Sequence, residues 1–322
     1  MFSQMRERYG LSMIRQLYGA ARKRKDAGKK NWPLVYKTTK FLANIGTPVF
    51  QHFNTKPGTD KEHGLIVSLT TFPERISKVW ITIATIMNQT YRPKRIILWL
   101  AKEQFSGEAV LPKKLLRLKK RGLEIRFCED LKPHKKYFYT MKEYPEECVV
   151  TIDDDVLYPE DHLQQLWETH LKHPKEVCCQ YAHKITYDKN GRIDLYENWE
   201  SCFGRYTDPS LQIMPVGCGG VLYPPNALSE EVFHKENIKR LCPMMDDLWL
   251  KSMAVLKGTK TVLCSKGSLI YFDVIGTRKS GLQHTNAGEK KNDIAMKAIV
   301  DAYPEVGETL YRDEIKRKTN VL

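Results

Sequence analysis

Three consecutive aspartates, Asp153, Asp154 and Asp155, follow directly on the apolar run at 148–152 (CVVTI). Such a run is typical of a buried strand, so the carboxylates are expected at its carboxyl end. Adjacent carboxylates repel one another, and the folded chain must offset this with a cation or with hydrogen bonds. Mg²⁺ or Mn²⁺ would do so, with Asp153 and Asp155 in one site and Asp154 pointing elsewhere. A polar turn that caps the next helix is the alternative, because Asp is a favoured cap.

A segment rich in lysine and aromatic residues lies before that run, at 132–139 (KPHKKYFY). The charges of Lys135 and Lys136 would complement phosphate oxygens, and the ring of Tyr137 could stack on a base or a sugar. An exposed charged loop would have the same composition, so both interpretations stay open.

Glycine is concentrated at 217–225 (GCGGVLYPP), where Gly219 and Gly220 are adjacent. Such a segment lets the backbone pass close to a ligand or to a neighbouring element. It is not a phosphate-binding P-loop, because no GKS or GKT follows it. A turn with a purely structural role is the alternative.

Asp246 and Asp247 form a second acidic group, directly before the apolar residues at 248–250 (LWL). The pattern predicts a helix that begins at these two carboxylates. Negative charge at the start of a helix is stabilised by the helix dipole, so capping alone would account for the pair.

Alternating strands and helices are predicted to position these residues. Apolar runs at 65–69, 95–100 and 148–152 predict strands, as does the segment 123–127 (LEIRF). Apolar residues at three- and four-residue steps over 76–87 predict a helix after the first strand. Helical patterns between most of the strands imply right-handed crossovers. The expected fold is therefore α/β, with a mostly parallel central sheet flanked by helices.

Parallel α/β sheets bind ligands beyond the carboxyl ends of their strands, where loops converge. Two loops are candidates on this ground: 153–159, and the loop after the first strand, which contains Thr70, Phe72 and Arg75. Arg75 would contact an anionic ligand there, or would simply begin the helix that follows.

The composition is that of a folded globular protein, with 42% hydrophobic residues in a chain of 322. That length suits one large α/β domain with terminal additions. The eight cysteines show no paired CxxC spacing and are expected to be reduced thiols in the core. No apolar stretch is long enough to span a bilayer, and charged residues interrupt the amino terminus, which predicts a cytoplasmic protein.

The amino-terminal part carries most of the basic excess. Residues 1–63 contain thirteen Lys and Arg against four Asp and Glu, within a chain of net charge +14. Such a segment attracts anionic lipid headgroups, nucleic acid or phosphorylated substrates. Met13, Ile14, Leu17 and Tyr18 fall at helical spacing, so a basic amphipathic helix would lie on the cytosolic face of a membrane or pack on the rest of the chain.

These motifs together resemble those of a known enzyme class. Asp153, Asp154 and Asp155 resemble the DXD motif of GT-A glycosyltransferases, in which carboxylates hold a metal against a nucleotide diphosphate and contact the ribose. The segments 66–76 (IVSLTTFPERI) and 83–100 (IATIMNQTYRPKRIILWL) resemble the first strand, helix and second strand of family 2-like bacterial glycosyltransferases. The resemblance covers about Gly64 to Asp293, which is most of the chain.

The resemblance implies a GT-A-like, Rossmann-related catalytic domain at 64–295, a basic helical extension at 1–63 and a helical tail at 296–322. It implies sugar transfer from a nucleotide-sugar donor, with a UDP-sugar favoured and a GDP-sugar possible, to a glycan or lipid-linked acceptor. Mn²⁺ or Mg²⁺ would assist, and the setting would be synthesis of a surface polysaccharide at the membrane.

The resemblance also assigns roles to residues. The loop with Thr70, Phe72 and Arg75 and the segment with Lys135, Lys136 and Tyr137 would contact the donor, as would Asp153 and Asp154. Gly219 and Gly220 would lie beneath the donor sugar and the acceptor.

The acidic pair at the later helix resembles the ED motif of inverting members of this class, whose carboxylate accepts the proton of the attacking hydroxyl. Asp247 matches its second position, and Asp246 replaces the usual Glu, so either could be the base. A late histidine completes the metal shell in several GT-A enzymes, and His284 would match it, although a lone surface histidine is the commoner case. Inversion is expected, with retention as the alternative.

Two other functions are alternatives to sugar transfer. The net charge would suit a basic nucleic-acid-binding protein, but the cations cluster before the catalytic pattern and no known nucleic-acid-binding motif is present, so no nucleic acid is expected. A metal-dependent phosphoryl-transfer enzyme or nuclease would use the same aspartates, and would hydrolyse phosphodiesters without a sugar acceptor.

Overall fold

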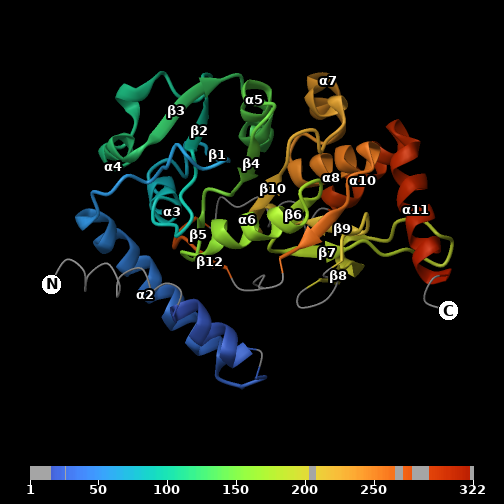
Figure 1. Ribbon diagram of the computed structural model, residues 1–322, viewed down its shortest axis with the longest axis horizontal. Helices are drawn as coiled ribbons and strands as arrows, with labels where there is room; N and C mark the ends of the chain where they lie inside the picture. Colours follow the sequence, from blue (N-terminus) through green and yellow to red (C-terminus); the bar gives the residue numbers. More distant parts are fainter. Residues whose placement is uncertain (1–15, 26, 203–207, 265–270, 278–289, 320–322) are drawn as a thin grey trace.

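The computed structural model describes residues 16–25, 27–202, 208–264, 271–277 and 290–319 (Figure 1). Its strands are β1 (Leu65–Thr70), β2 (Arg95–Ala101), β3 (Leu123–Cys128), β4 (Cys148–Thr151), β5 (Val156–Leu157), β6 (Val177–Cys179), β7 (Ala182–Lys184), β8 (Glu200–Ser201), β9 (Ile213–Pro215), β10 (Val221–Tyr223), β11 (Thr261–Leu263) and β12 (Phe272–Asp273).

The α-helices of the same residues alternate with many of these strands. With named bounds they are α2 (Trp32–Phe53), α3 (Val79–Ile86), α4 (Lys113–Arg117), α5 (Lys135–Glu143), α6 (His162–Lys172), α7 (Lys235–Leu241), α8 (Asp246–Lys257), α10 (Lys291–Ala302) and α11 (Pro304–Thr319). Short 3₁₀ turns connect several of them, among them η3 (Lys132–His134), η5 (Gly217–Gly219) and η6 (Glu230–Phe233).

The central sheet has seven strands in the order β11-β6-β10-β4-β1-β2-β3. The pairings β1–β2, β1–β4, β2–β3 and β6–β11 are parallel, whereas β10 runs antiparallel to both of its neighbours, β4 and β6. The α/β class and the mostly parallel sheet flanked by helices are thereby confirmed. The four predicted strands agree with β1 to β4 to within a residue at each end. β1, β2 and β4 are mostly apolar and buried on both faces. β3 lies at the edge of the sheet, and its charged residues Glu124 and Arg126 are only half-buried.

Helices cover both faces of this sheet. Side chains of α3, α4 and α6 form one core with the sheet, and side chains of α5, α8 and α10 form the other. Alternation along the strands divides the residues between them: on β6, Cys178 belongs to the first core and Cys179 to the second. All eight cysteines are unbridged, and all but Cys218 are buried.

The order of the strands creates a switch point. From β1 the chain moves through β2 to β3 on one side, and then returns to place β4 on the other side of β1. In an open α/β sheet, ligands bind at the carboxyl edge beside such a reversal. Because β10 is antiparallel, with Val221 opposite Thr151, its amino end lies at this same edge, and its carboxyl end, with Tyr223 opposite Val149, lies at the other.

The carboxyl-terminal helices belong to the body of the molecule. Met296, Ile299, Val306 and Leu310 are buried in the core that contains α8. The domain boundary predicted between residues 295 and 296 falls inside α10 (Lys291–Ala302).

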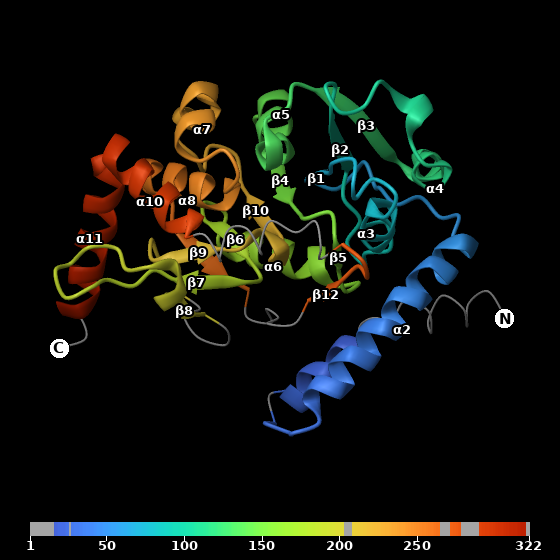
Figure 2. The same cartoon turned by 180° about the vertical axis from the view of Figure 1, so that it is seen from behind.

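Residues 16–25 are helical, and with α2 they slant past one side of the α/β body in both views (Figures 1 and 2). Tyr18 is buried: its ring stacks on Phe272 with centroids 4.0 Å apart, and its hydroxyl donates to the Leu157 carbonyl at 2.5 Å. Of the two alternatives for this segment, packing on the body therefore holds for Tyr18. Met13 and Ile14 lie outside the described residues. Among the helices of the described residues, none combines the length and apolar character needed to cross a membrane.

Candidate active site

Asp154 is the buried member of the acidic run. Its side chain is 7% exposed, and its Oδ1 lies 2.5 Å from Nη1 of Arg75. Thr71 donates its hydroxyl to the other carboxylate oxygen at 2.5 Å. Because β1 and β4 are neighbours, the loop after β1 meets the loop after β4 here, and an arginine in the first fixes an aspartate in the second.

Asp153 and Asp155 are the more open members, with side chains 33% and 20% exposed. Arg75 also reaches Asp155, with Nη2 at 3.0 Å from Oδ2. Burial raises the pKa of Asp155 to about 7, although Arg75 acts to lower it, and the neighbouring Asp154 and Asp153 raise it further. Burial acts to lower the pKa of Arg75, but the charges of Asp154, Asp155 and Asp153 raise it more, so its pKa lies above the ordinary value.

The donor set suits a divalent cation that takes few protein ligands. Asp154 is occupied by Arg75 and Thr71, which leaves Asp153 and Asp155 as the carboxylates that could face a ligand. Among the described residues, no group of three His, Cys, Asp or Glu could hold a metal ion. Mg²⁺ and Mn²⁺ accept such an incomplete set, because they commonly bind through one or two carboxylates and take water and substrate phosphates for the rest.

Lys136 connects the acidic run to the second acidic pair. Its Nζ lies 2.9 Å from Oδ1 of Asp153 and 2.9 Å from Oδ2 of Asp246, and its side chain is only 5% exposed. Burial by itself lowers the pKa of Lys136, but Asp153, Asp246 and Asp247 raise it more, so its pKa lies well above the ordinary value. A permanent positive charge thus sits between the two groups of carboxylates.

Asp246 and Asp247 begin α8, as the sequence predicted, but their surroundings differ. Asp246 is buried against the ammonium of Lys136. Asp247 is partly exposed, and its Oδ2 accepts the backbone N–H of Gly217 at 2.8 Å. Burial and the negative charge of Asp246 raise the pKa of Asp247 to about 7. A carboxylate with a pKa of about 7 can accept a proton near neutral pH.

The glycines before β10 fit tightly among neighbours. A Cβ on Gly217 would lie 2.7 Å from Oδ1 of Asp247, so only glycine lets the backbone donate to that carboxylate. Gly220 has a φ of +70°, and a Cβ there would lie 2.4 Å from the ring of His162. A Cβ on Gly219 would lie 2.6 Å from Cβ of Tyr181. Packing against protein accounts for Gly219 and Gly220, which favours the structural alternative for those two.

Two residues predicted to contact a donor occupy other positions. Lys135 is buried and pairs with Asp130 at 2.6 Å. Tyr137 is fully buried, and its hydroxyl bonds to the His134 ring and the Val232 carbonyl. These contacts favour structural roles for Lys135 and Tyr137. The segment forms helix α5, and of the three residues only Lys136 reaches the acidic edge, the carboxyl edge of the sheet that carries Asp153, Asp154 and Asp155.

Thr70 and Phe72 flank Thr71, which binds Asp154. Thr70 donates its hydroxyl to the Trp99 carbonyl at 2.8 Å, which directs it toward β2. Phe72 is half-buried, and its ring lies under the guanidinium of Arg75, 5.3 Å from centroid to carbon. It thereby helps to hold Arg75 in place. His284 lies outside the described residues; the segment before it ends at Thr277, whose carbonyl is 3.4 Å from Nη2 of Arg75.

Three residues of the site were missed from the sequence. Thr71 binds Asp154, Gly217 binds Asp247, and the Tyr158 hydroxyl accepts the backbone N–H of Asp153 at 3.1 Å. Thr71 lies in the loop after the first strand and Tyr158 in the loop 153–159. Both loops were predicted to bind a ligand, so the position of these two residues could have identified them. Gly217 could not have been chosen over the neighbouring glycines, because its partner is thirty residues away in the chain.

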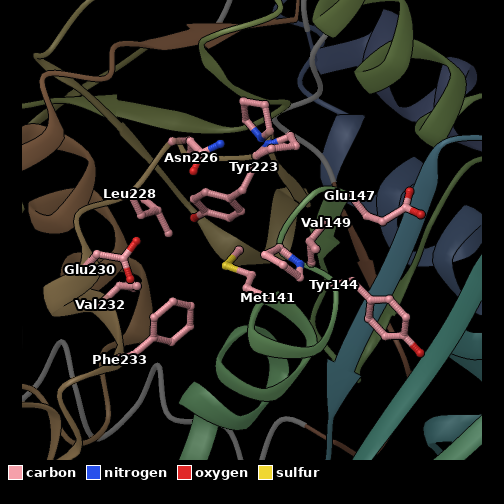
Figure 3. A pocket seen from close by; sticks show the side chains of 14 residues that line it. Met141, Tyr144, Glu147, Val149, Tyr223, Asn226, Leu228, Glu230, Val232 and Phe233 are labelled. Atoms are coloured by element: carbon pink, nitrogen blue, oxygen red, sulfur yellow. The ribbon is translucent and has the colours of Figure 1, made fainter.

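A pocket of about 80 Å³ lies at the opposite end of β4 (Figure 3). Tyr223, Phe233 and Met141 surround it in the picture, and its remaining lining is Tyr144, Pro145, Glu147, Val149, Pro224, Pro225, Asn226, Ala227, Leu228, Glu230 and Val232. None of the candidate residues lines this pocket.

No protein-family model and no curated protein matches the sequence. Among solved structures, one similar chain is TarS 1–349 from S. aureus, at 13% identity and a TM-score of 0.43, covering 65% of this chain and 60% of that chain. This chain thus spans less than two thirds of the TarS chain. Another is the mannosyltransferase PcManGT from Pyrobaculum calidifontis in complex with GDP-Man and Mn²⁺, at 13% identity and a TM-score of 0.46, covering 86% of this chain and 79% of that chain.

Proposed function

We propose that the chain is a metal-dependent glycosyltransferase that moves a sugar from a nucleotide-diphosphate donor to an acceptor hydroxyl with inversion. The observation that carries this proposal is the pair of carboxylate groups joined by Lys136: two partly open aspartates on one side, and an aspartate with a raised pKa on the other. A leaving group that gains negative charge and an acceptor that loses a proton need these two kinds of group side by side.

On the donor side, Asp153 and Asp155 would hold Mn²⁺ or Mg²⁺, which neutralises charge on a departing diphosphate when bound. Arg75 and Thr71 fix the loop by binding Asp154, so that the flanking carboxylates keep their positions. Lys136 adds a positive charge at the same edge, and an ammonium suits phosphate oxygens.

On the acceptor side, Asp247 takes the proton of the attacking hydroxyl. The acceptor oxygen forms a bond to the anomeric carbon of the sugar, the bond from that carbon to the diphosphate breaks, and its electron pair leaves with the diphosphate. Lys136 pairs with Asp246, and Asp247 has a pKa of about 7, so Asp247 exchanges a proton readily at neutral pH.

The finer assignments follow the sequence resemblance. The donor is a UDP-sugar or a GDP-sugar, the acceptor is a glycan or a lipid-linked glycan, and the setting is surface polysaccharide synthesis. PcManGT is described in complex with GDP-Man and Mn²⁺, so a GDP-sugar belongs in any screen beside UDP-sugars.

The test is thermal unfolding of the full chain with a panel of nucleotide sugars, with and without Mn²⁺. We expect one nucleotide class to raise the midpoint only when the metal is present, since a ligand stabilises the state that binds it. Asp155→Asn should abolish that shift. NMR of the product's anomeric centre then distinguishes inversion from retention.

A failed screen would be informative. Stabilisation by Mn²⁺ alone, combined with hydrolysis of phosphodiesters in the absence of any sugar acceptor, would replace this proposal with a phosphoryl-transfer enzyme. If nucleotide sugars raise the unfolding midpoint equally with and without Mn²⁺, Asp153 and Asp155 do not have the proposed metal-binding role.

A further inference from the structure

The outer face of α2 is apolar and exposed. Leu34, Phe41, Leu42, Ile45 and Val49 are 67%, 55%, 46%, 51% and 52% exposed, and they are five of the twelve large hydrophobic side chains exposed among the described residues. Their spacing of three, four and seven residues places them on one side of the helix. We call these five residues the apolar stripe.

The stripe is not the packing face of the helix. Thr39, Ala43 and Thr47 are buried against the body and form the opposite side of α2. The helix is fixed there by Lys40, whose Nζ lies 2.5 Å from Asp273, and by Asn44, which bonds to Asp273 and Ile275. Within the part of the chain that the structure describes, the stripe therefore stays exposed after the helix has docked.

Positive charge lies beside the stripe. Between residues 16 and 40 the chain has eight Lys and Arg and one Asp. Lys23, Arg24, Lys29, Lys30 and Lys37 are exposed on the first helix, the turn and the start of α2. An apolar helix face bordered by lysine and arginine has the chemistry of a bilayer interface, with acyl chains for the stripe and anionic headgroups for the cations.

The same helix is tied to the acidic edge. Tyr36 donates to the Tyr271 carbonyl at 3.0 Å, and the next residues form β12, which pairs with β5 directly after the acidic run. Val274 then donates its backbone N–H to the Asp155 carbonyl at 2.7 Å. A surface that holds α2 thus holds the acidic edge at a fixed distance from it.

We propose that the apolar stripe and the cations beside it dock this chain on an anionic membrane surface. The proposed bilayer contact lies on α2, whereas Tyr18, one of the residues that suggested an amphipathic helix in the sequence, is buried against the body. The role of this docking in sugar transfer rests on the proposed function. A docked chain would present its acidic edge to acceptors carried by the membrane.

The test is co-sedimentation of the full chain with vesicles of phosphatidylcholine, with and without phosphatidylglycerol. The double variant F41Q/I45Q should bind anionic vesicles at least about tenfold more weakly, because two apolar side chains no longer enter the bilayer. Replacing Lys29 and Lys30 by Gln should weaken binding about fivefold for each charge removed, and only on vesicles with anionic lipid.

L171Q is the matched control, since Leu171 is 64% exposed on α6 and lies outside the stripe. It should bind as the parent does, and all variants should unfold at the parent temperature. Parent-like binding by F41Q/I45Q overturns the proposal, as does an equal loss in L171Q. A change from dimer to monomer in F41Q/I45Q with vesicle binding intact would instead assign the stripe to a second copy of the chain. Because no donor is needed, a chain that binds vesicles but transfers no sugar would refute the proposed function alone.

Discussion

Strand β4 carries different chemistry at its two ends. At its amino end lies the pocket of Figure 3, lined mainly by apolar, aromatic and proline side chains. Two carboxylates line it, Glu147 and Glu230, and Glu147 pairs with Lys94 at a half-exposed position. At its carboxyl end lie Asp153, Asp154 and Asp155, held by an arginine and a lysine that are both largely buried.

The two ends of β4 thus separate an apolar pocket from the proposed reaction site. Carboxylates in a poorly solvated place cost folding free energy, by several kcal/mol for each buried ion before its partners compensate. The raised pKa values of Asp155 and Asp247, both about 7, show that compensation is incomplete at the carboxyl edge. Such groups gather where chemistry is done. Matched substitutions at the two ends of β4 test whether only the carboxyl end serves the reaction.

The largest effect is expected for Asp155→Asn. The amide keeps the shape of the side chain but loses the charge that would hold a metal, so sugar transfer should fall by about 10³-fold or more. Initial rates with saturating donor and a titration of Mn²⁺ measure it. Glu147→Gln makes the same chemical change at the other end of β4 and should leave the rate within about twofold. Equal losses in both variants would erase the distinction between the ends.

Lys136→Met should affect stability as well as rate. It removes the ammonium between Asp153 and Asp246 and leaves both carboxylates without that partner, a change that costs about 3–5 kcal/mol for buried pairs. For a chain of this size we expect the unfolding midpoint to fall by roughly 5–10 °C.

The double variant Lys136→Met/Asp246→Asn is the control for this interpretation. It should recover part of the lost stability, because one of the two stranded charges is gone. A double variant no more stable than Lys136→Met would show that the lysine acts by packing rather than by charge.

Asp247→Asn should reduce turnover by about 10²-fold while leaving donor binding unchanged. The base acts in its ionised form, so the parent rate should fall as the pH drops below about 7, where Asp247 gains a proton. Asp155 also has a pKa of about 7, so the profile is measured with saturating Mn²⁺, and under that condition the limb should be absent from the residual activity of Asp247→Asn. Rates from pH 5.5 to 8.5, with donor affinity from thermal shifts, measure both effects. A variant that keeps the acidic limb would assign it to another group.

Much of the fold could be predicted because the relevant signals are local. The strands β1, β2 and β4 are mostly apolar runs, and the acidic run was predicted at the end of β4. The start of α8 at Asp246 and Asp247 was predicted for the same reason, since a change from acidic to apolar residues marks a helix start. These features depend on neighbours in the chain.

The orientation of individual side chains could not be predicted from the sequence. Lys135, Lys136 and Tyr137 look equally suited to a donor, but on helix α5 they point in three directions, and only Lys136 reaches the acidic edge. The position of β10, antiparallel between β4 and β6, also could not be predicted, because its three residues carry no signal of their partners.

Tyr223→Phe should have the smallest effect, and it tests the pocket end of β4. The ring of Tyr223 is buried, and its hydroxyl has no hydrogen-bond partner among the described residues. A buried polar group without a partner costs free energy, so removing it should leave the unfolding midpoint unchanged or raise it by about 1–3 °C. Sugar transfer should stay at the parent rate, because the pocket contains none of the proposed reacting groups. A clear loss of rate with donor binding intact would mean that the hydroxyl meets a ligand or an ordered water in the pocket, and that both ends of β4 serve the reaction.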